Sequence, residues 1–204
     1  MQFALILIAI VCLGIAIFAF IQSSKKRTQE AQAPQRRDPF ADATGDTAKF
    51  SPESIGPGAV LSWGNVDYVV RGTLTVQQGP YTWYEHMLDG GDGAHWLGVE
   101  VDEGQLELVM WRTQRGEKPE LSGRIEYAGK VYREDERGNG HYTSEGNTGL
   151  PAQGETMYVD YSGAEGTSGD ERLGLESFDG SEWELSTGHV VLPGEFTVYP
   201  APKA

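Results

Sequence analysis

An uninterrupted apolar run from Phe3 to Ile21 constrains this 204-residue chain more than any other feature. Backbone groups in hydrocarbon have no water to bond, so a lone run of this kind can cross a bilayer only as a helix. Its length, at about 1.5 Å per residue, is roughly 28 Å, close to the roughly 30 Å thickness of the hydrocarbon layer. The run contains no charged side chain. We therefore expect residues 1–22 to be a transmembrane anchor.

Basic residues near the C-terminal end of this run give it an expected direction. They are Lys25, Lys26, Arg27, Arg36 and Arg37. Because basic flanks stay on the cytoplasmic side, we expect a single-pass protein of the cell membrane whose C-terminal part is cytoplasmic. A reversed topology is one alternative. A cleaved secretory signal is the other, but no basic segment precedes the run and no small-x-small cleavage site follows it.

Composition separates a linker from the folded part of the chain. Residues 23–55 form a basic stub followed by a segment rich in Gln, Ala, Asp, Thr and Pro, which is typical of a flexible tether. The formal net charge is −14, although the first fifty residues are net positive. A domain this acidic would be repelled by nucleic acid and anionic lipid. We expect no nucleic-acid partner, and contact with membrane lipid only through residues 3–21 and the basic stub.

Short β-branched and aromatic segments separated by turns dominate residues 56–200, which we interpret as one domain followed by a tail, 201–204. Dipeptides such as Gly64-Asn65 and Gly79-Pro80 mark the turns, and no helical periodicity is sustained after the anchor. The sequence therefore predicts an all-β domain, either a sandwich or barrel-like. The expected strands are 59–63, 67–76, 81–88, 95–101, 105–112, 130–133, 141–144, 155–161, 172–178, 182–186, 189–192 and 196–199.

One strand shows clear alternation. Within residues 105–110, Leu106, Leu108 and Met110 share one face and Glu107 lies on the other. This pattern is typical of a half-buried strand with its leucines in the core.

The domain also contains an internal similarity. Leu97 to Gly104 matches Leu173 to Gly180 at its Leu, Gly, Glu and final Gly positions. Upstream, Trp83-Tyr84 aligns with Met157-Tyr158, and the turn at Gly64-Asn65 faintly resembles Ala128-Gly129. We interpret these matches as two related β halves, with chance similarity among Gly- and Glu-rich turns as the alternative. A structure that placed Glu100 and Glu176 in unrelated strand environments would exclude the duplication.

No motif names a reaction. The chain lacks a phosphate-binding loop, a dinucleotide fingerprint, a His-Glu-x-x-His zinc motif and a Gly-x-Ser-x-Gly nucleophile motif. We therefore predict no catalytic residue, cofactor or metal, and favour a non-enzymatic role while leaving the question open. The loop 89–93 has calcium-type residues without the alternate carboxylates of an EF-hand, so we expect a turn. The four histidines lack ligand spacing and are expected on the surface: His86, His95, His141 and His189.

Three glutamates and two tryptophans form the candidate ligand or partner site. Glu85 shares strand parity with Trp83, and an acid on an apolar-leaning face needs a partner. Glu100 and Glu176 occupy matching positions of the repeat, and Trp96 lies on the strand that carries Glu100. The alternatives are solvated glutamates or structural ion pairs, and core or rim packing for the tryptophans.

The order of these segments resembles a bacterial domain-of-unknown-function family, number 4178. The resemblance spans nearly everything after the linker, and its most specific part is the Trp-x-Glu block at Trp83 followed by Trp-Leu-x-x-Glu at Trp96. His86 stands where the family pattern leads us to expect Tyr. The resemblance implies an all-β domain and supplies no mechanism. The segments that carry it are Gly58-Ala59-Val60, Tyr68 to Gly72, Trp83 to Leu88, Trp96 to Glu100, Lys130-Val131-Tyr132 and Leu175-Glu176.

Three functions follow as hypotheses. The first is a membrane-tethered, non-catalytic binding or scaffold module that engages an unidentified protein in envelope maintenance or stress response. The second is a small-ligand sensor or enzyme with an acidic, aromatic cleft between the two halves. The third is an accessory subunit of a membrane complex. Glutamates that converge in a cleft with raised pKa values would favour the second, whereas a flat apolar patch or open strand edge would favour the others.

Overall fold

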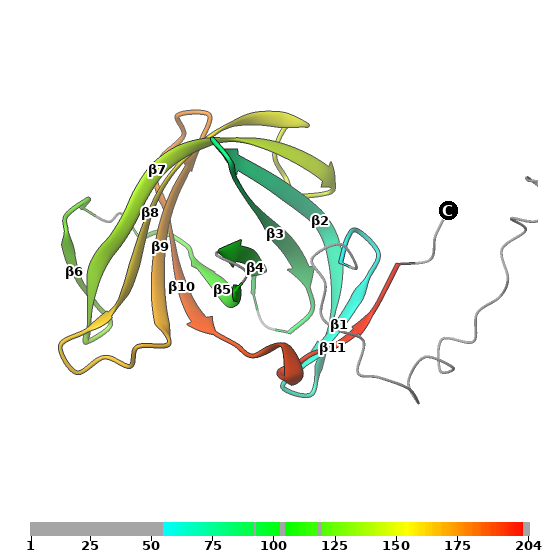
Figure 1. Cartoon of the computed structure of the whole chain (residues 1–204), viewed down its shortest axis with the longest axis horizontal. Coiled ribbons are helices and arrows are strands. Elements are labelled where there is room, and N and C mark those ends of the chain that lie inside the picture. Colours follow the sequence, from blue (N-terminus) through cyan, green and yellow to red (C-terminus); the bar gives the residue numbers. More distant parts are fainter. Residues whose placement is uncertain (1–54, 92, 103–104, 118–119, 202–204) are drawn as a thin grey trace, which may run out of the picture. The chain divides into compact units, whose positions relative to one another are not determined.

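The computed structural model describes residues 55–201 apart from 92, 103–104 and 118–119, and this part of the chain forms one eleven-stranded antiparallel sheet (Figure 1). A single 3-10 turn, η3 (Pro193–Glu195), precedes the last strand. The strands are β1 (Val60–Trp63), β2 (Val66–Gln78), β3 (Tyr81–Asp89), β4 (His95–Asp102), β5 (Gln105–Gln114), β6 (Arg124–Tyr127), β7 (Lys130–Gly146), β8 (Gln153–Ala164), β9 (Glu171–Phe178), β10 (Glu184–Val190) and β11 (Thr197–Tyr199).

Eight of these strands close into a barrel (Figure 1). Neighbours follow the order β2-β3-β4-β5-β10-β9-β8-β7, and the second half of β7 returns to β2, with Gly146 opposite Gly72 and His141 opposite Gln77. β1 pairs with the first half of β2 and carries β11, while β6 pairs with the first half of β7. The prediction of an all-β, barrel-like domain is confirmed, and the sandwich alternative is not formed.

Most predicted strands agree with the observed ones, but two pairs were wrongly divided. Segments 130–133 and 141–144 belong to one strand, β7, because the charged and Gly-rich residues between them pair with β8. The break expected near Gly188 is likewise absent, since Gly188 pairs with both β5 and β9. β6 was not predicted, because its residues alternate between exposed and only partly buried. Backbone pairing with neighbouring strands, rather than apolar alternation, holds these segments in the sheet.

The strands before and after residue 115 form two meanders, β2 to β5 and β7 to β10, with matching register. Each begins with a hairpin whose two turn residues have positive φ: Gly64 and Asn65 (57° and 66°) and Ala128 and Gly129 (48° and 75°). Two-residue turns of this kind match the right-handed twist of the two strands that they connect. A β-bulge follows in each long strand, between Val70 and Gly72 in β2 and between Glu134 and Glu136 in β7.

The two repeat-related glutamates lie in corresponding strand environments. Glu100 on β4 lies between Trp83 of β3 and Glu107 of β5. Glu176 on β9 lies between Tyr158 of β8 and Glu184 of β10. The strand register thus makes Trp83 the counterpart of Tyr158, so the sequence alignment of Trp83 with Met157 was wrong by one residue.

The apolar residues lie mainly outside the barrel wall, beneath the extra strands. Leu97 and Leu108 pack with Leu61 of β1 and Phe196 in one cluster. Leu173, Leu175 and Tyr161 pack in a second cluster against Ile125 and Tyr127 of β6. Burying a side chain of this size is worth about 1.5 to 3 kcal/mol. These outer clusters can therefore stabilise the fold while the interior of the barrel remains polar.

The prediction of a half-buried strand at residues 105–110 is confirmed. Leu108 and Met110 are buried in the outer cluster, which also contains Leu61 of β1 and Val198 of β11. Glu107 faces the interior of the barrel. Alternation correctly separates the two faces of β5, but it does not reveal that extra strands cover the apolar face.

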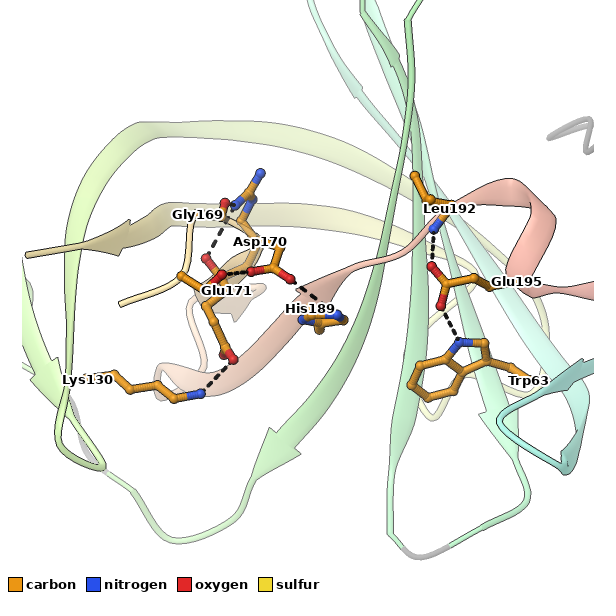
Figure 2. A network of polar contacts seen from close by, with 10 residues as sticks. Trp63, Lys130, Gly169, Asp170, Glu171, His189, Leu192 and Glu195 are labelled. Atoms are coloured by element: carbon orange, nitrogen blue, oxygen red, sulfur yellow. Dashed lines mark hydrogen bonds and ion pairs between the residues drawn. The ribbon is translucent and has the colours of Figure 1, made fainter. Parts of the chain in front are cut away.

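The C-terminal segment is tied to the barrel by contacts drawn in Figure 2. Glu195 of η3 accepts hydrogen bonds from Trp63 Nε1 at 3.5 Å and from the Leu192 backbone at 2.9 Å. Figure 2 also shows an ion pair within the barrel: Lys130, at the start of β7, pairs with Glu171, at the start of β9, at 2.7 Å.

Among the residues described, no helix is long and apolar enough to span a membrane. The expected anchor from Phe3 to Ile21, its basic flank and the linker up to residue 54 lie outside the described residues.

Candidate functional site

A cavity of about 550 Å³ lies inside the barrel and is lined by residues from all eight of its strands. Its lining is dominated by two kinds of side chain. The acidic ones are Glu85, Glu100, Glu107, Asp135, Glu136, Asp160, Glu176 and Glu184, and the aromatic ones are Tyr81, Trp83, Trp96, Trp111, Tyr158 and Phe178. One basic residue, Arg172, belongs to the described lining. The volume is in the range of sites that hold small organic ligands.

All five residues of the sequence-derived candidate site border this cavity: Trp83, Glu85, Trp96, Glu100 and Glu176. Strand parity explains how they meet, because inward residues of β3 pair with inward residues of β4. Trp83 lies opposite Glu100, and Glu85 lies opposite Gly98. Trp96 is also packed against the small apolar cluster of Leu74, Val76 and Tyr142.

Glu85 and Glu176 form a carboxyl pair in the cavity wall. Their side chains are surrounded by protein and keep accessible surface only where they border the cavity. Burial raises the pKa of both, and a hydrogen bond between them raises the pKa of Glu176 further while opposing the rise at Glu85. Glu176 is therefore the protonated member and donates to Glu85. Trp83 Nε1 donates a second hydrogen bond to Glu85 at 3.1 Å, which favours its charged form.

Asp160 completes the acidic cluster from β8. It lines the cavity, and burial together with repulsion from Glu85, Glu136, Glu100 and Asp135 raises its pKa to about 7. Its electrostatic partners among the described residues are thus carboxylates. A charge taken from water without a compensating partner is costly, so the side chain stores free energy that a bound positive charge would release.

Trp111 of β5 was not among the predicted site residues. Its indole lies against three glycines of neighbouring strands: a Cβ atom on Gly188 would lie 2.5 Å from Trp111 Cε3, and one on Gly98 would lie 2.8 Å from Nε1. A Cβ atom on Gly174 would lie 3.3 Å from the same indole and 3.6 Å from Asp160 Oδ1. The indole and the Asp160 carboxyl group therefore meet over Gly174.

Trp83 is held by its hydrogen bond to Glu85 and by a contact with the Tyr158 ring. Its ring meets Tyr158 edge to face, with centroids 5.3 Å apart and an interplanar angle of 72°. The Tyr158 hydroxyl donates to Glu136 at 2.6 Å, and burial raises the pKa of that hydroxyl. Aromatic pairs in this geometry are favourable, and they fix the orientation of both rings.

Arg172 does not neutralise the central acids. Its guanidinium contacts Glu107 Oε1 at 3.3 Å and donates to the Gly169 carbonyl oxygen at 2.6 Å. The pair with Glu107 accounts for one of the eight carboxyl groups in the lining. The cluster of Glu85, Asp160 and Glu176 remains acidic.

The prediction that the histidines lie on the surface is wrong for two of the four. His86 and His95 are buried rather than on the surface, with exposed fractions of 0% and 7%. His86 Nδ1 lies 2.9 Å from Thr73 Oγ1, and burial lowers the pKa of its imidazole to about 4. The other two histidines are exposed and lie near acids, His141 beside Glu155 and His189 beside Asp170.

A second hollow of about 450 Å³ lies on the outer face of β4, β5 and β10. It borders the polar network of Figure 2, in which Lys130 pairs with Glu171 and His189 lies 3.6 Å from Asp170. Charges of both signs meet there, in contrast to the interior of the barrel.

Comparison with known proteins shows similarity to one protein family and to mycobacterial proteins. A model of the family described as a domain of unknown function, DUF4178, matches residues 56–193. The chain belongs to this family. The match to the DUF4178 domain runs from just before β1 into η3 and includes every residue of the interior lining.

The DUF4178 domain is shared with mycobacterial relatives. An uncharacterized protein of Mycobacterium tuberculosis is 45% identical over 205 residues, which cover 97% of this chain and 96% of the relative. An uncharacterized protein of Mycobacterium bovis shows the same identity and coverage. No solved structure matches the chain.

Proposed function

We propose that this DUF4178 protein is a non-catalytic binding module that holds a small molecule in the interior of its barrel. The observation that carries the proposal is the cavity of about 550 Å³, in which Trp83, Trp111 and the pair of Glu85 and Glu176 converge. Binding sites combine apolar or aromatic walls with a few placed polar groups and titratable residues of perturbed pKa. This favours the second sequence-based hypothesis, because neither a scaffold nor an accessory subunit requires an interior cavity.

The two halves of the barrel support the same interpretation. We infer that they descend from one duplicated unit, since their hairpins, bulges and glutamates correspond in register. The cavity lies where the two halves face each other, so each contributes an equivalent set of side chains. We further propose that residues 3–21 anchor the protein in the cell membrane with the barrel in the cytoplasm, supported by the length of the run and its one-sided basic flank.

The proposed function is tested by what the purified protein carries. Full-length protein is extracted in mild detergent, and the small molecules released on denaturation are identified by mass spectrometry. Ser186→Phe fills the cavity from β10, and Met157→Phe adds the same ring at an exposed position of β8. We expect a molecule in near-stoichiometric amount with the wild type and Met157→Phe, and its loss with Ser186→Phe. Circular dichroism establishes that both variants are folded. The proposal fails if no molecule is carried, or if a folded Ser186→Phe retains it.

A further inference from the structure

The interior of the barrel has a strong excess of one charge. Eight carboxyl side chains border it, against the single guanidinium of Arg172 in the described lining. Arg172 is engaged by Glu107 and the Gly169 carbonyl. The most deeply buried acids, Glu85, Asp160 and Glu176, therefore have one another as their main electrostatic neighbours. Buried charges in proteins are ordinarily paired. Among the described residues of the lining, no basic side chain pairs with these three acids.

Asp160 shows where such a partner would lie. Its side chain borders the cavity, and the carboxylates that raise its pKa come from β3, β4 and β7. Gly174, opposite it on β9, has no side chain to cover the carboxyl group. The position that a Cβ atom on Gly174 would take lies 3.6 Å from Asp160 Oδ1 and 3.3 Å from the Trp111 ring, so the carboxyl group and the indole border the same space over Gly174. A ligand group that entered the cavity over Gly174 would meet both of them.

Aromatic rings attract cations through the negative potential of their faces, and tryptophan does so most strongly. The Trp111 ring takes the space that side chains at Gly98 and Gly188 would need, and it lies 3.3 Å from where a Cβ atom on Gly174 would be. Trp83 is oriented by its hydrogen bond to Glu85 and its contact with Tyr158. Carboxylates between fixed aromatic rings are the combination that recognises ammonium groups.

We propose that the barrel binds an organic cation, a molecule with one or more ammonium groups on an apolar body, and that an ammonium group lies between Asp160, the Glu85–Glu176 pair and the Trp111 ring. This inference rests on the proposed function and specifies its ligand class. The apolar body would lie against the other aromatic side chains of the lining, Trp83, Trp96 and Phe178.

An organic cation fits this cavity better than a metal ion. Calcium and magnesium take about six or more oxygen ligands at roughly 2.0 to 2.6 Å. No group of three acids, histidines or cysteines among the described residues is placed to hold a metal. Aromatic faces offer nothing to a hard cation of that kind, and a volume of about 550 Å³ exceeds what a single ion needs.

Calorimetric titration of the full-length protein in detergent, after removal of bound molecules, tests the inference. The probes are a series of alkyl and phenylalkyl mono-, di- and triamines, each with the matching neutral alcohol, at pH 8. We expect the best amine to bind at least about tenfold more tightly than its alcohol, the effect of a charge-assisted hydrogen bond and a cation–π contact. Asp160→Asn and Glu85→Gln, which each remove a carboxylate charge from the cavity, should reduce this preference to about twofold or less, whereas Glu126→Gln, an exposed acid on β6, should preserve it.

The outcomes separate the ligand class from the proposed function. Equal binding of amine and alcohol, no binding of any amine, or a preference that survives both Asp160→Asn and Glu85→Gln would overturn the organic-cation inference. Displacement of a bound amine by micromolar calcium or magnesium would also overturn it, in favour of a metal site. In each case the proposed function stands if the purified protein carries a neutral or anionic molecule that Ser186→Phe excludes, and fails if it carries none.

Discussion

Replacing Asp160 by Asn should make the protein more stable at neutral and alkaline pH. The pKa of Asp160 is about 7 in the folded protein, against 3.8 for an ordinary aspartate. Between these two values, the unfolded chain loses the proton while the folded chain keeps it. Each pKa unit of difference corresponds to about 1.4 kcal/mol, so the cost to the free energy of unfolding reaches about 4 kcal/mol above pH 7.

The sign follows from linkage. A carboxyl group whose folded pKa is raised imposes no penalty below pH 3.8, a growing penalty as the pH rises toward 7, and a constant one above it. Asn is neutral throughout and nearly the same size. We therefore expect Asp160→Asn to raise the free energy of unfolding by about 4 kcal/mol at pH 8 and by about 2 kcal/mol at pH 5.

Urea unfolding of the full-length protein in detergent, followed by tryptophan fluorescence at pH 8 and pH 5, measures both values. Glu126→Gln serves as the control and should change stability by less than about 0.5 kcal/mol at either pH, since the side chain is exposed. The reasoning is refuted if Asp160→Asn destabilises the protein at pH 8, or if its effect is the same at both pH values. The first result would mean that the carboxylate already has a strong partner.

Four further predictions follow from the same geometry. Amine affinity should rise about tenfold from pH 6 to pH 8 in calorimetric titrations, because Asp160, with a pKa of about 7, must lose its proton to face a cation. The burial that lowers the pKa of His86 to about 4 should cost about 3 kcal/mol of stability as the pH falls from 6.5 to 4, and His86→Gln should abolish that loss in urea unfolding. Gly188→Ala should displace the Trp111 ring and cost about 1 to 3 kcal/mol in urea unfolding, whereas Gly169→Ala, with open space around it, should be nearly neutral. In sealed inside-out vesicles an external protease should digest the barrel, and in right-side-out vesicles it should not; the reverse pattern would refute the cytoplasmic placement.

Much of the architecture could be predicted from alternation and turn residues, because these are local properties. Barrel closure could not, since it depends on β10 returning between β5 and β9 and on β7 meeting β2. The same limit explains why alternation alone did not show what covers the leucine face of β5. Only the tertiary arrangement shows that β1 and β11 cover that face from outside.

The candidate site shows the same division. Glu85, Glu100 and Glu176 could be found because strand parity and the repeat are visible in the sequence. Asp160 was missed through an alignment error of one residue: the strand register sets Glu85, opposite Gly98, against Asp160, opposite Gly174. With Trp83 aligned to Tyr158 instead of Met157, the sequence alignment would have paired Glu85 with Asp160. Trp111 had no comparable signal, because its role depends on glycines from three other strands.

The correspondence between the halves also explains why the interior is so acidic. A duplicated meander would carry its inward carboxyl groups twice: Glu100 has Glu176 as its counterpart in register, and Asp160, the counterpart of Glu85, adds its charge to that of Glu85. Symmetry alone provides no cation to balance them. The exception is Trp111, whose counterpart in register is Gly188, directly across the β5–β10 pair. A bulky ring at both positions could not fit, since even a Cβ atom at Gly188 would lie 2.5 Å from the Trp111 ring. One half therefore supplies the indole and the other supplies the space for it, so the two halves of the cavity are not equivalent, and a ligand of the proposed kind would bind in one orientation.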